Sequence, residues 1–322
     1  PLYSSAASDV YKRQVHTMLA GAGGIDFALL VIAADDGVMP QTREHLAIID
    51  LLGITRGIVA LTKSDVASPE RLAEVSREIR ETLSGTTLEA ADILPVSALT
   101  GDGIDELRAR LVAASNMASN RAENGRFRLA VDRSFTLSGV GVVVTGTVLS
   151  GSVSVEDHVT VSPSGLNARV RSMHVQNRPA KQARAGDRCA LNLTGDGITK
   201  ESLHRGDVVV DQDLHMPTDR IDARLRLLPS ETRTIRQWFP VRLHHAATEI
   251  GAHIVLLGDQ PLAPGGEADV QLVLEHPIAA AVPDRFVIRD PSAQRTIGGG
   301  YFIDLRAPER RRRTPERQAQ RT

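Results

Sequence analysis

The chain is 322 residues long, with 42% hydrophobic residues and a formal net charge of −1 at pH 7. This length predicts two or three domains, and no run of about 18 apolar residues is present to span a membrane. The single cysteine, Cys189, excludes an internal disulfide and fits a reducing compartment, and it is better explained as a small buried residue than as a reactive thiol.

Residues 27 to 115 alternate between predicted strands and predicted helices. Phe27–Ala34 is a continuous apolar run, which is typical of a central parallel strand buried on both faces. The next elements are expected in this order: a helix from Pro40, a strand at Gly57–Leu61, a helix from Pro69 after a Ser68 cap, a strand at Ile93–Val96 and a helix near Ile104. This alternation predicts a parallel sheet with right-handed crossovers.

After a polar linker near 116–125, short strand-like segments are separated by turns rich in Gly and Asp. A first set is expected at Phe127–Val131, Gly141–Val148, His158–Val161, Ala168–Val175, Arg188–Leu193 and Asp207–Val210. A second set is expected at Ile221–Leu227, Val241–His245, Ala252–Leu257, Ala268–Leu274, Arg285–Ile288 and Gly300–Ile303. Evenly spaced short strands predict closed barrels, one for each set.

The motif Thr62-Lys63-Ser64-Asp65 directly follows a predicted strand. It would lie at the carboxyl edge of a parallel sheet, where α/β proteins bind ligands. The Asp65 carboxylate can accept from the ring N–H and the exocyclic amine of guanine, a donor pair that adenine lacks, and each hydrogen bond to a charged group is worth about 1.5–3 kcal/mol. The Lys63 stem can cover the base plane while its ammonium stays in water. Taken alone, the motif is better explained as a solvated turn.

Ser97-Ala98-Leu99 follows the next predicted strand, and a backbone N–H there can donate to the guanine carbonyl oxygen. Two such motifs in this order, each after a strand and before a helix, are far more specific than either one. No Gly-x-x-x-x-Gly-Lys-Ser/Thr loop for gripping phosphates occurs in the sequence. The glycines at Gly21–Gly24 precede their strand, which argues against a dinucleotide-binding fingerprint. The histidines are scattered, so no metal site is predicted.

The predicted fold class is α/β plus all-β: a partial parallel sheet of the P-loop GTPase type with helices, followed by two β-barrels. We expect the following division: 1–14, foreign to the fold or disordered and without the apolar centre of a secretory signal; 15–116, the C-terminal part of a GTPase domain; 126–213, the first barrel; 218–306, the second barrel; and 307–322, a basic disordered tail. The arginines of this tail suit either a solvated linker or contact with RNA phosphate.

Several stretches resemble the translational GTPases, and most closely the bacterial selenocysteine-specific elongation factor. The resemblance is carried by Met18–Asp26, Asp35–Leu46, Thr62–Asp65, Phe127–Phe135, Gly141–Thr147, Arg205–Asp207 and Arg285–Asp290. It covers residues 15 to 306 and implies that the two β-barrels are of the translation-factor type. Elongation factor Tu is similar over Pro40–His45 but has Asn where this chain has Thr62.

The resemblance implies a pocket for the aminoacyl group on the first barrel, formed by Asp132, Arg133 and Arg188. A selenol is more acidic than a thiol, whose free pKa is about 8.5, so it is largely anionic at neutral pH. Two arginines converging there would favour a selenolate over serine or cysteine. Without the resemblance, Asp132 and Arg133 would be interpreted as a surface pair worth about 0–1 kcal/mol.

The resemblance further implies binding of GTP and GDP, with Mg²⁺ in the intact family member, and a monomeric, cytoplasmic factor that contacts no membrane. The implied partners are selenocysteyl-tRNA, the ribosome and, through a region expected beyond Thr322, an mRNA hairpin at a recoded UGA codon. The phosphate loop and switch segments would fall before Val15, so no catalytic residue is assigned and negligible GTP hydrolysis by this chain alone is expected. Two alternatives stay open: another translational GTPase of the elongation factor Tu type, or a non-enzymatic tRNA-binding module of two barrels.

Overall fold

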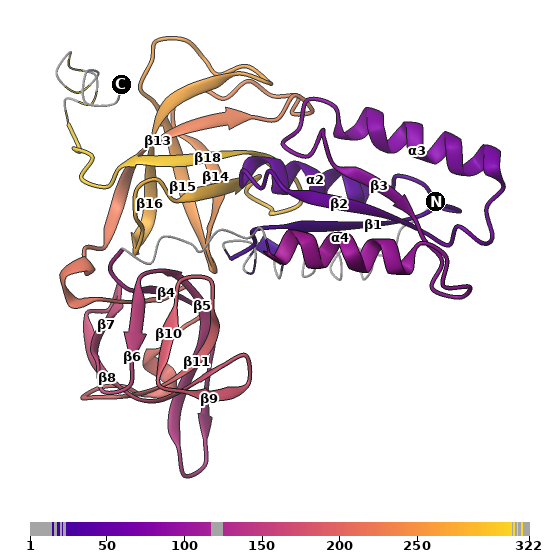
Figure 1. The fold of residues 1–322 in the computed structure, drawn as a ribbon. Coiled ribbons are helices and arrows are strands. Elements are labelled where there is room, and N and C mark those ends of the chain that lie inside the picture. Colours follow the sequence, from indigo (N-terminus) through magenta and orange to yellow (C-terminus); the bar gives the residue numbers. More distant parts are fainter. Residues whose placement is uncertain are drawn as a thin grey trace. The chain divides into compact units, whose positions relative to one another are not determined.

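The computed structural model describes residues 24–116 and 125–310 together with Val15, Met18, Leu19, Gly21, Arg312, Thr314 and Arg317. The expected segment 1–14 and much of the expected tail 307–322 therefore lie outside the described residues. The chain divides into two compact units, one running from β1 to α4 and the other from β4 to β18 (Figure 1). None of the described helices is both long enough and apolar enough to span a bilayer.

The first unit is a parallel sheet with helices, as the sequence predicts. Its elements are β1 (Ala28–Ala33), α2 (Pro40–Leu51), β2 (Gly57–Thr62), α3 (Pro69–Leu83), β3 (Asp92–Pro95) and α4 (Ile104–Asn116). The strands pair in parallel in the order β1-β2-β3. The start of α3 follows from its cap, because Ser68 Oγ accepts a hydrogen bond from the Arg71 amide at 3.2 Å and Pro69 needs no such partner.

The prediction that β1 is buried on both faces is wrong for the described part of the chain. Leu30 and Ile32 are buried, but Leu29 and Val31 on the opposite face are 42% and 63% exposed. Strand side chains alternate between faces, so these exposures show that only one face of β1 is packed among the described residues. On α4, similarly, the apolar side chains border an open cavity of about 440 Å³ and no residue is buried.

The second unit begins with a barrel built from the first predicted strand set. Its strands are β4 (Arg128–Leu137), β5 (Gly141–Ser150), β6 (Ser152–Ser154), β7 (His158–Ser162), β8 (Leu166–Val175), β9 (Arg178–Ala180), β10 (Gln182–Arg184), β11 (Arg188–Thr194) and β12 (Val208–Val210). They are followed by the short 3₁₀ helix η2 (Gln212–Leu214), and η1 (Lys200–Ser202) precedes β12. Pairing runs β11-β5-β4-β12-β7-β8, and β8 pairs back to β11, which closes the ring.

The second barrel is built from the second predicted set. Its strands are β13 (Thr218–Leu227), β14 (Phe239–His245), β15 (Thr248–Leu256), β16 (Glu267–Ile278), β17 (Arg285–Arg289) and β18 (Thr296–Asp304). They close in the order β13-β16-β15-β14-β17-β18. Its core includes the fully buried Phe286 and Phe302, whose rings stack with centroids 5.1 Å apart. Every predicted strand of this set is therefore confirmed.

Within the second unit, a buried ionic group links the two barrels. Arg128 of β4 contacts both carboxylate oxygens of Asp284, which lies just before β17. Asp284 Oδ2 also lies 2.9 Å from Nε2 of His245 at the end of β14. A second link is the hydrogen bond that Thr248 Oγ1 donates to the Gly206 carbonyl oxygen at 2.8 Å.

Candidate functional site

The two motifs predicted to read guanine lie at one edge of the α/β unit, because all three strands run parallel and end there. The Ser64 amide donates to the Val96 carbonyl oxygen at 3.2 Å, and the Val96 amide donates to the Leu61 carbonyl oxygen at 2.8 Å. Thr62 Oγ1 donates to the carbonyl oxygen of Ile32 at 3.3 Å, so its side chain ties the end of β2 to β1. The structure thus brings the segments 62–65 and 97–99 together.

Lys63 has a backbone conformation that favours glycine. Its φ is +57°, a left-handed value that costs a side-chain-bearing residue on the order of 1–3 kcal/mol unless its surroundings impose it. Lys63 Nζ lies 2.7 Å from Asp35 Oδ2 and 3.7 Å from Asp36 Oδ2. The hydrogen bond to Lys63 lowers the pKa of Asp35, and the hydrogen bond to Asp35 raises the pKa of Lys63.

Asp35 was not among the predicted site residues. Its position directly after the apolar run Phe27–Ala34, at the same carboxyl edge as Asp65, is the sequence signal that would have identified it. The pair with Lys63 is half-exposed and contributes little to stability. Its geometric effect is larger, because it holds the lysine side chain along the edge where a base would lie.

Ser97 organises the second loop. It is fully buried, and its Oγ accepts hydrogen bonds from the amides of Leu99 at 3.2 Å and Thr100 at 3.1 Å. The Ser97 amide donates to the Asp102 carbonyl oxygen, and Gly103, with a φ of +72°, passes so near β3 that a Cβ would lie 2.2 Å from the Pro95 carbonyl oxygen. This packing leaves the side chains of Ala98 and Leu99 exposed at the edge.

Asp65 is also exposed at this edge. An accessible carboxylate beside a rigid loop of small residues can take two N–H donors of a planar base and present backbone N–H groups to its carbonyl. In the part of the chain that the structure describes, no three His, Cys, Asp or Glu side chains gather as a metal site.

On the first barrel, Asp132 lies at an irregularity of β4. Val131 pairs with Gly146 of β5 but Arg133 already pairs with Thr145, so Asp132 is an extra residue, a β-bulge that redirects side chains. Gly146 permits this, because a Cβ there would lie 2.0 Å from the Ala130 carbonyl oxygen. The bulge points the Asp132 carboxylate across β5 toward β11.

The structure joins two of the three residues predicted for the aminoacyl pocket. Arg188 Nη1 of β11 lies 2.5 Å from Asp132 Oδ2, and Thr145 Oγ1 of β5 donates to Asp132 Oδ1 at 2.7 Å. Asp132 is largely covered, whereas the Arg188 side chain is 53% exposed. Arg133 follows at the bulge with an exposed side chain. Thr145 is the residue that the sequence analysis missed, since a threonine inside a β-branched run carries no distinguishing signal.

The neighbouring Cys189 behaves as predicted, as a buried and unreactive residue. Its side chain packs in the barrel core, and burial together with the nearby Asp187 raises the pKa of the thiol to about 12. A protonated thiol is neither a nucleophile nor a metal ligand at neutral pH.

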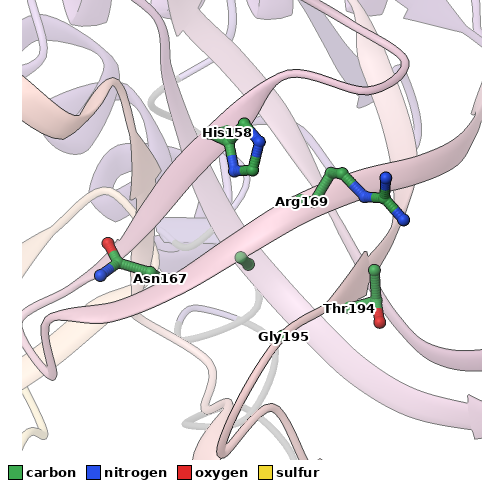
Figure 2. Close-up of a pocket in the computed structure, with 6 residues that line it drawn as sticks. His158, Asn167, Arg169, Thr194 and Gly195 are labelled. Atoms are coloured by element: carbon green, nitrogen blue, oxygen red, sulfur yellow. The ribbon is translucent and has the colours of Figure 1, made fainter.

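The first barrel also carries an open cavity of about 340 Å³ at the far end of β11 (Figure 2). Figure 2 shows His158 and Arg169 on neighbouring strands beside it. Asn167, Ala168, Thr194 and Gly195 complete the lining. Arg188 and Thr194 are the two ends of β11, about 20 Å apart along a strand of this length. None of the predicted site residues lines this cavity.

Comparison with known proteins gives a consistent result along the chain. Residues 12–117 match the elongation factor Tu GTP binding domain, residues 141–210 match elongation factor Tu domain 2, and residues 218–309 match the β-barrel domain of the selenocysteine-specific elongation factor. The third match covers the strands of the second barrel and is the one specific to a single branch of translation factors.

Individual relatives agree with these matches. The selenocysteine-specific elongation factors of Escherichia coli (strain K12) and Desulfomicrobium baculatum are 41% and 40% identical over 95% and 91% of this chain. These alignments cover 47% and 46% of the two relatives, so the chain spans about half their length. The solved structure of translation elongation factor SelB from Methanococcus maripaludis, in complex with the GTP analogue GppNHp, superposes with a TM-score of 0.79 at 28% identity, covering 92% of this chain and 69% of that one.

Proposed function

Since the chain belongs to the family of selenocysteine-specific elongation factors, we propose that it contributes to a GTP-dependent factor that delivers selenocysteyl-tRNA to the ribosome at a recoded UGA codon. The observation that carries the proposal is the meeting of segments 62–65 and 97–99 at one sheet edge, linked by the hydrogen bond between Ser64 and Val96. The Asp132–Arg188 pair on the first barrel adds the specificity for the amino acid.

Guanine recognition is proposed for Thr62, Lys63, Asp65, Ser97, Ala98 and Leu99. Asp65 accepts the ring N–H and the exocyclic amine of the base, and Lys63, positioned by Asp35, covers the base plane with its stem. Because the Leu99 amide is already bonded to Ser97 Oγ, the Ala98 amide is our candidate donor to the guanine carbonyl oxygen. Thr62 and Ser97 act indirectly, by fixing the two loops.

Mg²⁺ belongs to the phosphate end of a bound nucleotide, where it is coordinated mainly by phosphate oxygens and water. We assign the described residues of this edge to the guanine base and not to the phosphates or Mg²⁺. They account for guanine binding, and no step of GTP hydrolysis is assigned to them.

For the aminoacyl group, Arg188 is the proposed partner of the selenolate. The guanidinium is held by a covered carboxylate at 2.5 Å while half of the arginine side chain stays open to solvent, so one side can face a ligand. Thr145 donates a hydrogen bond to the other oxygen of Asp132 and thereby orients the carboxylate toward Arg188. Arg133 supplies a second positive charge beside it. The neutral side-chain hydroxyl of a seryl group offers these cations no comparable attraction.

Binding of a fluorescent GDP to the full 322-residue chain tests the nucleotide half of the proposal. Guanine contacts without phosphate contacts give weak binding, and Asp65→Ala should reduce the affinity at least tenfold, the loss expected for one bond to a charged group of about 1.5–3 kcal/mol. Glu70→Ala, an exposed acidic residue at the start of α3, is the matched control and should leave the affinity unchanged. Equal binding of adenine and guanine nucleotides would contradict the assignment and favour the non-enzymatic module.

Competition between selenocysteyl-tRNA and seryl-tRNA tests the other half. We expect preference for selenocysteyl-tRNA, lost in Arg188→Ala and kept in Arg171→Ala, an exposed arginine of β8 on the same barrel. Absence of any preference would favour a factor of the elongation factor Tu type.

We propose the ribosome and an mRNA hairpin as partners of the whole factor, and the cytoplasm as its location. GTP turnover by this chain above a no-protein control would contradict the expectation that it is inactive alone.

A further inference from the structure

Two polar residues on the outer wall of the second barrel are buried where solvent is expected. Ile221 and Ala223 of β13 point into the core, so Asp222 between them points outward. Gln271 of β16 likewise lies between two core residues. Yet Asp222 is only 1% exposed and Gln271 is fully buried. Another segment of the chain therefore covers this part of the wall. Because burying a carboxylate or an amide without hydrogen bonds costs free energy, that segment is expected to supply polar partners.

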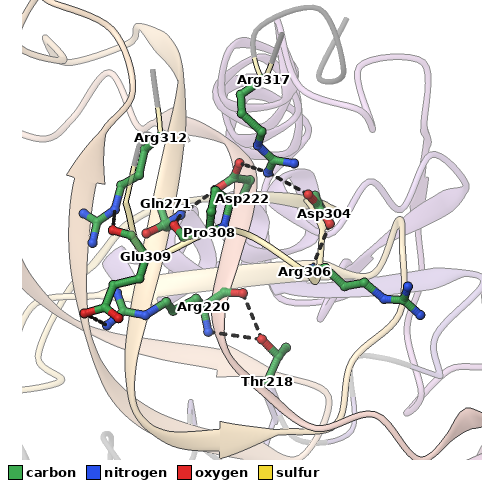
Figure 3. A network of polar contacts seen from close by, with 10 residues as sticks. All are labelled: Thr218, Arg220, Asp222, Gln271, Asp304, Arg306, Pro308, Glu309, Arg312 and Arg317. Carbon is green, nitrogen blue, oxygen red and sulfur yellow. Dashed lines mark hydrogen bonds and ion pairs between the residues drawn. The ribbon is translucent and has the colours of Figure 1, made fainter. Parts of the chain in front are cut away.

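The cover is the C-terminal strap, defined here as the described residues Arg306–Arg310, Arg312, Thr314 and Arg317 (Figure 3). Gln271 Nε2 donates to the Pro308 carbonyl oxygen at 3.1 Å, and Glu309 Oε1 lies 3.6 Å from Arg220 Nη2 of β13. Farther along the strap, the Arg312 guanidinium lies 5.8 Å from the ring centroid of Trp238. The strap therefore contacts side chains of β13 and β16 and the loop before β14.

At the centre of this surface two carboxylates face each other. Asp222 of β13 and Asp304 of β18 are direct cross-strand partners, an arrangement that is unfavourable for like charges. Arg317 Nη2 lies between them, 2.9 Å from Asp222 Oδ2 and 2.7 Å from Asp304 Oδ2 (Figure 3). Gln271 Nε2 donates to the remaining oxygen of Asp222 at 3.0 Å. A buried carboxylate beside a second, partly exposed carboxylate is stabilised by a cation, and Arg317 of the strap provides one.

We propose that Asp222 and Asp304 form a guanidinium-binding site on the second barrel, and that its ligand is Arg317 of the chain's own C-terminal strap. The site fastens the described part of the strap to the outer wall at β13 and β18. It replaces the expectation of a solvated basic tail at Arg317, whose charge is taken up by protein carboxylates and not by RNA phosphate. This inference does not depend on the delivery of selenocysteyl-tRNA.

Arg317→Ala in the full chain tests the site through two readouts. Hydrogen exchange of the backbone amides in 306–310 should become at least tenfold faster, because the strap loses the ion pairs of Arg317 with Asp222 and Asp304. Trp238 is the sole tryptophan, and its fluorescence should become more accessible to acrylamide as Arg312 leaves its ring. Arg310→Ala, an exposed arginine of the same strap, is the control and should change neither readout.

Two further experiments keep the test decisive if Arg317→Ala destabilises the barrel. Asp304→Asn, at the more exposed carboxylate, should open the strap in the same way, and Arg317→Ala added to it should have little additional effect on exchange. Argininamide added to Arg317→Ala should raise the melting temperature without restoring protection of 306–310, since it fills the site but is not joined to the strap. Unchanged exchange and quenching in both Arg317→Ala and Asp304→Asn would overturn the proposal, as would full additivity of the two substitutions.

Discussion

Removal of the Asp284 carboxylate, which links the two barrels, should cost a large part of the stability of the second unit. Arg128 approaches Asp284 with both terminal nitrogens, one of them at 3.1 Å, and His245 lies 2.9 Å away. The side chains of Arg128, Asp284 and His245 are 12%, 19% and 3% exposed. Asp284→Ala leaves Arg128 buried without its counter-ion, a defect that costs about 3–5 kcal/mol when burial is complete. The residual exposure of Asp284 lowers our expectation to about 2–4 kcal/mol in the free energy of unfolding.

A double-mutant cycle isolates this contact. Urea unfolding followed by circular dichroism should give Arg128→Ala and Asp284→Ala a coupling energy of about 1.5–3 kcal/mol, the range for hydrogen bonds to charged groups. The exposed pair Arg169–Glu156, at 2.9 Å, is the matched control and should couple by about 0.5 kcal/mol or less. A coupling energy for Arg128 and Asp284 as small as that of the control would refute the reasoning.

The same carboxylate predicts a pH dependence. Burial alone would raise the pKa of Asp284, but the hydrogen bond with His245 and the charge of Arg128 outweigh it and hold the pKa well below the usual 3.8. A carboxyl group whose pKa is lowered by folding stabilises the protein above its unfolded pKa, and this contribution is lost as the pH falls toward the folded value. The stability difference between wild type and Asp284→Ala should shrink as the pH falls below about 4, because the carboxylate becomes protonated and no longer compensates Arg128. A difference that persists unchanged at the lowest pH tolerated by the fold would contradict this.

Three further outcomes are expected. In thermal melts, Gly146→Ala should lower the melting temperature several times more than Gly258→Ala. A Cβ at position 146 would lie 2.0 Å from the Ala130 carbonyl oxygen, whereas a Cβ at position 258 meets nothing within 4 Å. Equal decreases in melting temperature would contradict the close approach at Gly146. Cys189, with its pKa raised to about 12 by burial, should stay unmodified by iodoacetamide at pH 8 and react after unfolding in urea, and labelling of the native protein would show the thiol to be accessible. Ser97→Ala removes the acceptor of two amide hydrogen bonds and should cost about 1–3 kcal/mol in unfolding free energy and weaken GDP binding, whereas unchanged binding would show that the loop holds its shape without Ser97.

Alternation of apolar residues was sufficient to predict most of the architecture. The second barrel is the clearest case, since the predicted segments Ile221–Leu227 and Ala268–Leu274 fall within β13 and β16 and their inward residues form the core. The predicted Ser68 cap of α3 is confirmed by its hydrogen bond to Arg71. These features depend on neighbours in sequence, so their signals are local.

The same kind of pattern failed for β1 because a continuous apolar run does not say how many layers will cover it. Leu29 and Val31 are as apolar as their neighbours, and their exposure shows that only one face of β1 is packed among the described residues. At the candidate sites, the sequence indicated Asp65 and Arg188 through motif and resemblance. It did not indicate Asp35 or Thr145, whose partners lie 28 and 13 residues away in the chain.

By itself, the sequence determined the order of elements, the two classes of domain, the family and the residues that match its motifs, because each of these is written in local spacing and residue type. Only the tertiary structure decided which charges meet. It placed Asp35 on Lys63, turned Asp132 toward Arg188 through a bulge, and set Asp222 opposite Asp304 with Arg317 between them. Such pairings depend on strand register and on the approach of distant segments. A one-residue change in the register of β13, for example, would turn Asp222 to the opposite face of the sheet, away from Asp304.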